Sequence, residues 1–135
     1  MADDKVDFEL VSPERLLLSE AVEMVVVPGT EGNFGVLPRH MLMISTVRPG
    51  IIQVFDNGAV THNIFVAGGF AEVTPERCTV LADQAMPVDE IDRAAAEQQL
   101  ANGREDLADA KDDIERRAAE KAIAVAEAML QASQS

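Results

Sequence analysis

The residue usage of the chain changes abruptly at Pro87. All six prolines, all five phenylalanines and seven of the eight glycines lie within residues 1–87, whereas 13 alanines lie within residues 88–135. Glycine and proline interrupt regular structure, and alanine has the highest helix propensity. We therefore expect two domains in this chain of 135 residues, one rich in turns (1–87) and one helical (88–135).

Short β-branched runs separated by turn residues fill the first domain. IIQVF is joined to AVTHNIFVA through Asn57 and Gly58. Because Asn-Gly adopts the positive φ angles of a tight turn, these two runs are expected to pair antiparallel. Polar residues alternate only weakly in IFVAGGFAEV, which favours one strand covered on both faces. Several short strands without a helix between them predict an antiparallel β-sandwich or flattened barrel. The other runs that predict strands are VDFELV, AVEMVVV and RCTVLAD.

The second domain has the pattern of two amphipathic helices. Asp89 and Glu90 follow Pro87, as acidic residues do at a helix N-terminus. A break near residues 109–113 would give two antiparallel helices of roughly 20 residues each. Gly103 could instead end the first helix early, although one glycine inside a helix costs only about 1 kcal/mol. The protein is thus expected to be of the α+β class, a sandwich followed by a helical hairpin.

The apolar residues of the second domain are spaced to lie on one helix face. Leucine or isoleucine recurs every seven residues at 100, 107 and 114, and positions 114, 118, 122, 125 and 129 follow at steps of four and three. Few of these side chains are large, and only a large one contributes about 1.5–3 kcal/mol when buried. Ordering each residue's backbone costs about 1–2 kcal/mol. We therefore expect the helices to bind each other weakly and to be able to move.

The charge and the N-terminus exclude several classes of protein. The net charge of −13 argues against binding to nucleic acid or to an anionic membrane surface. Cys78 has no cysteine to pair with, and MADDKVDFEL lacks the cationic start of a secretory signal. A cytosolic compartment is expected, and no apolar run approaches the 18 or so residues that span a bilayer.

The stretch VPGTEGNFGVLPRHMLM (27–43) is the most conspicuous loop, with glycines at 29, 32 and 35. A phosphate loop would lead into a helix and carry a cation, but here the charge is Glu31 and a strand-like run follows. His40 lacks any motif that signals a nucleophile or an orienting carboxylate, and a structural role in the loop is expected. Cys78 alternates with apolar residues and is expected to be buried rather than to act with His62. Neither zinc nor calcium spacing is present.

These residues resemble the epsilon subunit family of the F-type ATP synthase, the subunit called delta in mitochondria. The specific stretches are GTEGNFGVLPRH and GGFAEV followed by VLAD, and an acidic two-helix tail completes a match over essentially the whole sequence. The resemblance implies a ten-stranded sandwich that sits at the foot of the gamma stalk on the membrane-embedded c-ring. It implies no catalytic residues and no cofactor. The expected place is the cytoplasmic face of the bacterial inner membrane.

The family also implies site residues. The loop of Thr30, Glu31, Gly32 and Asn33 is expected to face the polar loops of the c-ring, and the tail is expected to restrain hydrolysis through contacts with the alpha and beta subunits of the head. A solvated turn is the alternative for Glu31. The net charge of −6 over residues 88–135 weakens the expectation of tail inhibition.

Some bacterial members bind ATP through a pattern of Ile or Leu, Asp, two residues, Arg and Ala. Here Ile91 and Asp92 begin the pattern, but Ala95 occupies the arginine position and Arg93 is displaced. The alternative function is a nucleotide-responsive module that binds ATP at the junction of hairpin and sandwich, with Ile91, Asp92 and Arg93 as the candidate site. A small hydrolase or transferase built on His40 or Cys78 is a third hypothesis.

Overall fold

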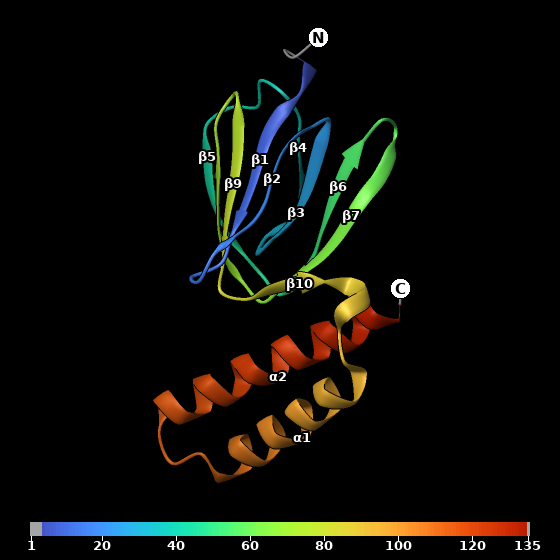
Figure 1. Ribbon diagram of the computed structural model, residues 1–135. Helices are drawn as coiled ribbons and strands as arrows, with labels where there is room; N and C mark the ends of the chain where they lie inside the picture. Colours follow the sequence, from blue (N-terminus) through green and yellow to red (C-terminus); the bar gives the residue numbers. More distant parts are fainter. Residues whose placement is uncertain (1–3, 135) are drawn as a thin grey trace. The chain divides into compact units, whose positions relative to one another are not determined.

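The computed structural model describes residues 4–134. This part of the protein divides into two compact units, with the boundary between Pro87 and Val88. The first unit is built of strands and the second of helices (Figure 1). The predicted α+β class is confirmed.

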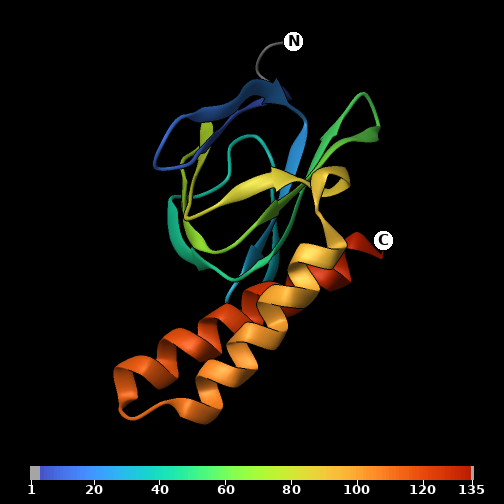
Figure 2. The ribbon, with the colours of Figure 1, turned by 60° about the horizontal axis from the view of Figure 1, so that its bottom comes forward.

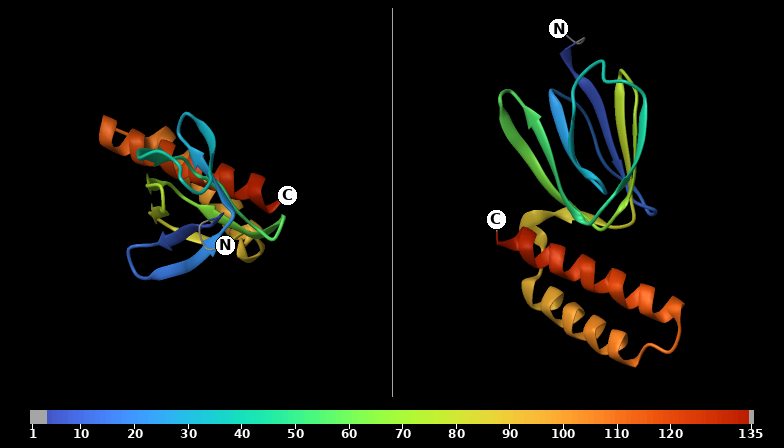
Figure 3. Two further views of the ribbon diagram at one scale, coloured as in Figure 1. Left: turned by 90° about the horizontal axis from the view of Figure 1, so that it is seen from above. Right: turned by 180° about the vertical axis from the view of Figure 1, so that it is seen from behind.

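Ten strands within residues 4–134 form one sheet in the order β10-β7-β6-β3-β5-β8-β9-β1-β2, and β4 pairs with β3 off this path. The sheet folds over at β3 and β5, which meet at the residue pair Gly29 and Val47. Its two halves face each other as the layers of the predicted sandwich (Figures 1 and 3). The strands are β1 (Val6–Val11), β2 (Leu16–Val22), β3 (Met24–Gly29), β4 (Gly32–Val36), β5 (Met43–Val47), β6 (Gly50–Asp56), β7 (Ala59–Val66), β8 (Gly69–Val73), β9 (Arg77–Ala82) and β10 (Ala85–Pro87).

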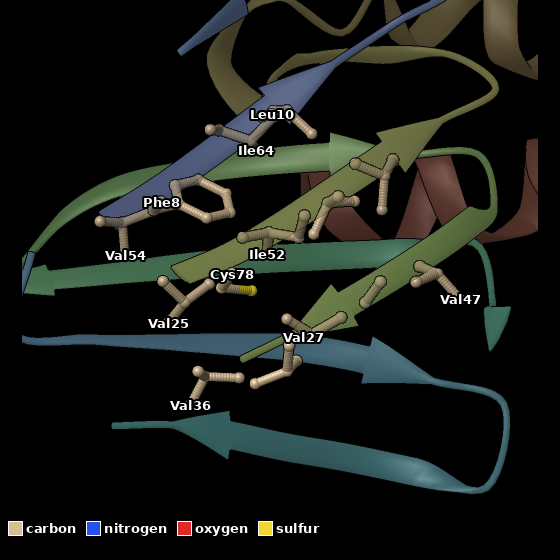
Figure 4. Close-up of a cluster of buried hydrophobic side chains, with 14 of the residues drawn as sticks. Phe8, Leu10, Val25, Val27, Val36, Val47, Ile52, Val54, Ile64 and Cys78 are labelled. Carbon is tan, nitrogen blue, oxygen red and sulfur yellow. The ribbon is translucent and has the colours of Figure 1, made fainter. Parts of the chain in front are cut away.

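Alternating apolar residues build the core between the layers. In β1 the side chains of Val6, Phe8 and Leu10 are fully buried, because successive side chains of a strand point to opposite faces. Figure 4 shows Phe8 and Leu10 directed toward residues of β3, β6 and β7. The core is mainly aliphatic, since the sequence has no Trp or Tyr and only five Phe. Its labelled members are Phe8, Leu10, Val25, Val27, Val36, Val47, Ile52, Val54, Ile64 and Cys78.

One strand pair departs from the otherwise antiparallel pairing of the predicted sandwich. β1 runs parallel to β9, with Asp7 opposite Arg77 and Val11 opposite Leu81. One edge of β1 is occupied by its hairpin partner β2, so the other edge pairs with a strand 70 residues later in the sequence. No local pattern encodes such a pairing.

The two glycine turns of the sequence have different outcomes. The predicted β6–β7 hairpin is confirmed: Asp56 pairs with Ala59, and Asn57 and Gly58 have φ angles of 53° and 76°. The prediction of one strand through IFVAGGFAEV is wrong. Gly68 has a φ of 124° and lies between β7 and β8, so the backbone turns there.

The helical unit contains a 3-10 turn, η2 (Val88–Glu90), and two helices, α1 (Arg93–Asp109) and α2 (Asp113–Ser133). α1 and α2 lie side by side (Figures 1 and 2). The predicted break at residues 109–113 is confirmed, and the alternative in which Gly103 ends the first helix is wrong. Asp89 and Glu90 lie in η2, while the Asp92 and Asp112 carboxylates cap α1 and α2.

The contact between the helices differs from the predicted apolar face. Ile114 is 80% exposed, and Ala118 and Ala122 are exposed as well. Met129 of the predicted stripe is buried, and Ala119 and Ala126, each one position away from the stripe, are buried too. Gly103 faces α2 so closely that a Cβ on it would lie 2.9 Å from Cγ1 of Ile123. Gly103 therefore belongs to the contact between α1 and α2, which the predicted apolar face did not include.

Candidate functional site

The conspicuous loop is the turn of a β-hairpin. Thr30 and Glu31 connect β3 to β4, and Gly29 and Gly32 form the last residue pair before the turn. Gly32 has a φ of 136°, a conformation that favours glycine. A Cβ on Gly29 would lie 2.8 Å from the Gly32 carbonyl oxygen, so glycine is required there too. The glycines therefore serve the turn, and β4 follows them rather than the helix that a phosphate loop needs.

The turn is held by the neighbouring segment of β5 and the residues after it. The Thr30 amide donates to the Thr46 carbonyl at 3.1 Å, and the two threonine hydroxyls lie 2.7 Å apart. The Arg48 guanidinium donates to the Gly29 carbonyl and, at 2.6 Å, to Oδ1 of Asn33. Sequence reasoning missed Thr46 and Arg48, because they lie 15 to 19 residues from their partners and no local motif marks them.

The residues predicted to face the c-ring are thus brought together on one exposed turn. Thr30, Glu31, Gly32 and Asn33 are all exposed. Glu31 lies at the tip of the hairpin, and its neighbours in the turn are fixed by hydrogen bonds to Thr46 and Arg48. Such an arrangement can present one negative charge to a partner with little loss of conformational entropy.

An exposed apolar surface adjoins this turn. Thr46, which bonds to Thr30, is the register partner of Phe70, and Phe70 is opposite Leu81 on β9. Leu81 is in turn opposite Val11 on β1. Register partners point to the same side of a sheet, so these side chains form a row on the outer face. Ile44 lies two residues before Thr46 on β5 and therefore points to the same side. We call Ile44, Phe70 and Leu81 the outer apolar face; they are 74%, 55% and 52% exposed, respectively.

His40 and Cys78 do not form a catalytic arrangement. Nδ1 of His40 lies 2.7 Å from the carbonyl oxygen of Met41, and because a carbonyl only accepts, Nδ1 carries the proton. Burial raises the pKa of the Cys78 thiol to about 12, so it stays neutral near pH 7. His62 lies 3.4 Å from a carboxylate oxygen of Glu20 at a half-exposed position, whereas Cys78 lies in the core.

The residues of the candidate ATP site have local roles in the helical unit. A carboxylate oxygen of Asp92 accepts from the Ala95 amide at 3.1 Å, which caps α1. Arg93 donates to the Ser133 hydroxyl at 3.3 Å and pairs with Glu97 at 3.4 Å. Ile91 is half-buried. Asp92 and Arg93 thus both have structural roles within the helical unit.

Two negative results apply to residues 4–134. In this range no group of three or more His, Cys, Asp or Glu side chains could hold a metal ion. None of the helices described there has the length and apolar character of a membrane span.

Two family models together match nearly the whole sequence. The model described as ATP synthase, Delta/Epsilon chain, beta-sandwich domain matches residues 5–88, and the model for the C-terminal domain of the ATP synthase epsilon chain matches residues 92–135. The protein is 56% identical over 132 residues to the ATP synthase epsilon chain of Rhodospirillum centenum. This alignment covers 94% of this sequence and 90% of the relative. It is 53% identical over 129 residues to that of Rhodospirillum rubrum, which covers 96% of each.

Solved structures agree in fold. A chain of the mitochondrial ATP synthase of Euglena gracilis superposes with a TM-score of 0.80 at 25% identity, and the match covers 98% of this protein and 82% of that one. A chain from the central stalk and c-ring of the Tetrahymena thermophila mitochondrial enzyme superposes with a TM-score of 0.74 at 13% identity, and the match covers 96% of each.

Proposed function

The chain belongs to the family of ATP synthase epsilon chains, and on this premise we propose that it binds the gamma subunit and the c-ring and couples rotation of the ring, through gamma, to ATP synthesis in the catalytic head. It is a non-catalytic subunit of the central stalk and works together with other subunits of the enzyme. The observation that carries the proposal is an exposed acidic turn next to an exposed apolar sheet face, both on one packed sandwich.

The outer apolar face is the proposed contact with gamma. Ile44, Phe70 and Leu81 are each more than half exposed, although they lie on three neighbouring strands. Clustered apolar side chains on a protein surface mark interaction sites. Burial of the surface that remains exposed on each would contribute about 1–2 kcal/mol, enough for three side chains to dominate the affinity of an interface.

The turn of Thr30, Glu31, Gly32 and Asn33 is the proposed contact with the c-ring. Its carboxylate would meet basic groups of the ring loops, and charge complementarity of this kind fixes partner and orientation. Thr46 belongs to the strand that carries the outer apolar face and also bonds to the turn. A load taken up at the turn therefore passes through hydrogen bonds to the gamma contact, and close packing resists deformation between them.

In this proposal the protein is peripheral to the cytoplasmic face of the bacterial inner membrane, which it meets only through the c-ring. The helical hairpin, α1 and α2, would act on the alpha and beta subunits of the head and restrain hydrolysis. The alternative, an ATP-responsive module at Ile91, Asp92 and Arg93, is not favoured, because Ala95 supplies no cation for a polyphosphate and the neighbouring side chains already have partners.

Titration of the full-length protein with purified gamma subunit tests the gamma contact. We expect the wild type to form a stable complex in native mass spectrometry and Ile44→Asp to weaken it at least about tenfold, because a buried unpaired carboxylate costs more than about 1.4 kcal/mol. Val60→Asp is the matched control, since Val60 is 40% exposed on β7 and lies outside the outer apolar face. Equal losses in both variants, or no complex with the wild type, would refute the proposal.

A further inference from the structure

Arg48 lies in the short connection between β5 and β6 and makes three hydrogen bonds to the β3–β4 hairpin. Its amide donates to the Pro28 carbonyl at 2.9 Å, and its guanidinium donates to the Gly29 carbonyl and to Oδ1 of Asn33. The side chain is half-buried, whereas the turn that it supports is exposed. We infer that Arg48 is a positioning residue, which fixes the turn so that Glu31 and Asn33 present a defined pair of groups to the c-ring.

The two groups that accept from the Arg48 side chain, the Gly29 carbonyl and Oδ1 of Asn33, flank the turn. Gly29 precedes Thr30 and Glu31, and Asn33 follows Gly32, so one planar guanidinium connects both strands of the hairpin beside the turn. Arginine suits this task because its donors form a rigid fork, whereas a lysine ammonium is a single point charge. Hydrogen bonds that involve a charged donor are also stronger than neutral ones. Without the guanidinium, residues 46–48 would hold the hairpin through the main-chain bond of residue 48 and the bonds to Thr46 alone.

The same contact orients the Asn33 amide. A guanidinium only donates, so Oδ1 must face it, and the Nδ2 group remains as a donor on an exposed residue. The turn therefore offers a negatively charged acceptor at Glu31 and a neutral donor at Asn33. The complementary partner is a ring loop that carries a cation or N–H group opposite Glu31 and a carbonyl or carboxylate oxygen opposite Asn33. This inference rests on the proposed contact with the c-ring and specifies its chemistry.

Order within the turn is measured first, on the full-length protein without any partner. Amide hydrogen exchange at residues 29–33 is expected to accelerate on the order of tenfold in Arg48→Met, because the side-chain bonds across the hairpin are lost. Arg48→Lys should give a smaller acceleration, since one ammonium cannot hold both acceptors as a fork does. Arg15→Met makes the same change of charge at an exposed position of the β1–β2 turn and should leave the loop unchanged. Wild-type exchange in Arg48→Met would overturn the inference.

Affinity for c-rings reconstituted in vesicles is measured next, as a double-mutant cycle. Arg48→Met should weaken binding several-fold in the wild type but have little further effect in the Glu31→Ala, Asn33→Ala background, since it acts through those two side chains. An equal loss in both backgrounds would show a merely structural role and overturn the inference. If neither Glu31→Ala nor Asn33→Ala weakened binding, the proposed ring contact itself would fail, whatever the exchange result.

Discussion

Replacement of Gly103 by alanine should destabilise the helical hairpin, although alanine is the better helix former. The added Cβ would lie 2.9 Å from Cγ1 of Ile123, 3.5 Å from its amide nitrogen and 3.7 Å from the Ala119 carbonyl oxygen. Only the first distance is too short for van der Waals contact, and Ile123 is β-branched and cannot easily change rotamer. Overpacking costs about 1–3 kcal/mol, while the gain in helix propensity is about 1 kcal/mol. A net loss of about 1 kcal/mol is expected from these two terms.

Removal of Cγ1 of Ile123 should turn the destabilising effect of Gly103→Ala into a stabilising one. In an Ile123→Ala background Cγ1 is absent, so Gly103→Ala should stabilise the helices by up to about 1 kcal/mol through propensity alone. Amide exchange at residues 93–133 of the full-length protein reports the opening free energy of each helix, and circular dichroism during urea unfolding gives an independent value. If Gly103→Ala changed the stability of the helices in the same direction in both backgrounds, the close approach of α1 and α2 would not be the reason for glycine at this position.

Three further outcomes are expected. The Cys78 thiol should resist alkylation at pH 8 in the native protein and react once urea unfolds it, and alkylation without denaturant would contradict its burial. Because burial raises the thiol pKa from 9.0 to about 12, its contribution to the free energy of unfolding is complete below pH 9 and is lost as the pH rises toward 12. Millimolar ATP should leave the midpoint of thermal unfolding of the full-length protein unchanged, because Arg93 is bonded to Ser133 and Glu97. A higher midpoint with ATP, measured by calorimetry, would favour the nucleotide hypothesis. Deletion of residues 88–135 should raise ATP hydrolysis by the assembled enzyme if the hairpin restrains it, and unchanged hydrolysis would exclude that role.

Features encoded by neighbouring residues were predictable from the sequence. The turn at Asn57 and Gly58 and the helix break at residues 109–113 depend on local backbone preferences, and both are confirmed. The glycines at 68 and 69 carried a similar signal, but the surrounding apolar residues masked it, and the predicted continuous strand is wrong.

Features that depend on distant residues were not predictable. The parallel pairing of β1 with β9 and the bonds from Arg48 to Gly29 and Asn33 join segments that no local pattern connects. The helix contact shows a subtler limit. The apolar period placed Met129 on the buried face but missed Ala119 and Ala126, one position away, and it missed Gly103, whose close approach to Ile123 depends on the other helix.

The place of β1 between β2 and β9 has a consequence for biosynthesis. A growing polypeptide closes the β1–β2 hairpin at once, but the second edge of β1 stays open until residues 77–82 have been made. An unpaired edge is a template for association with other polypeptides. Nascent polypeptides that stop before β9 should therefore aggregate on release from the ribosome, whereas those that extend just past it should be recovered as monomers.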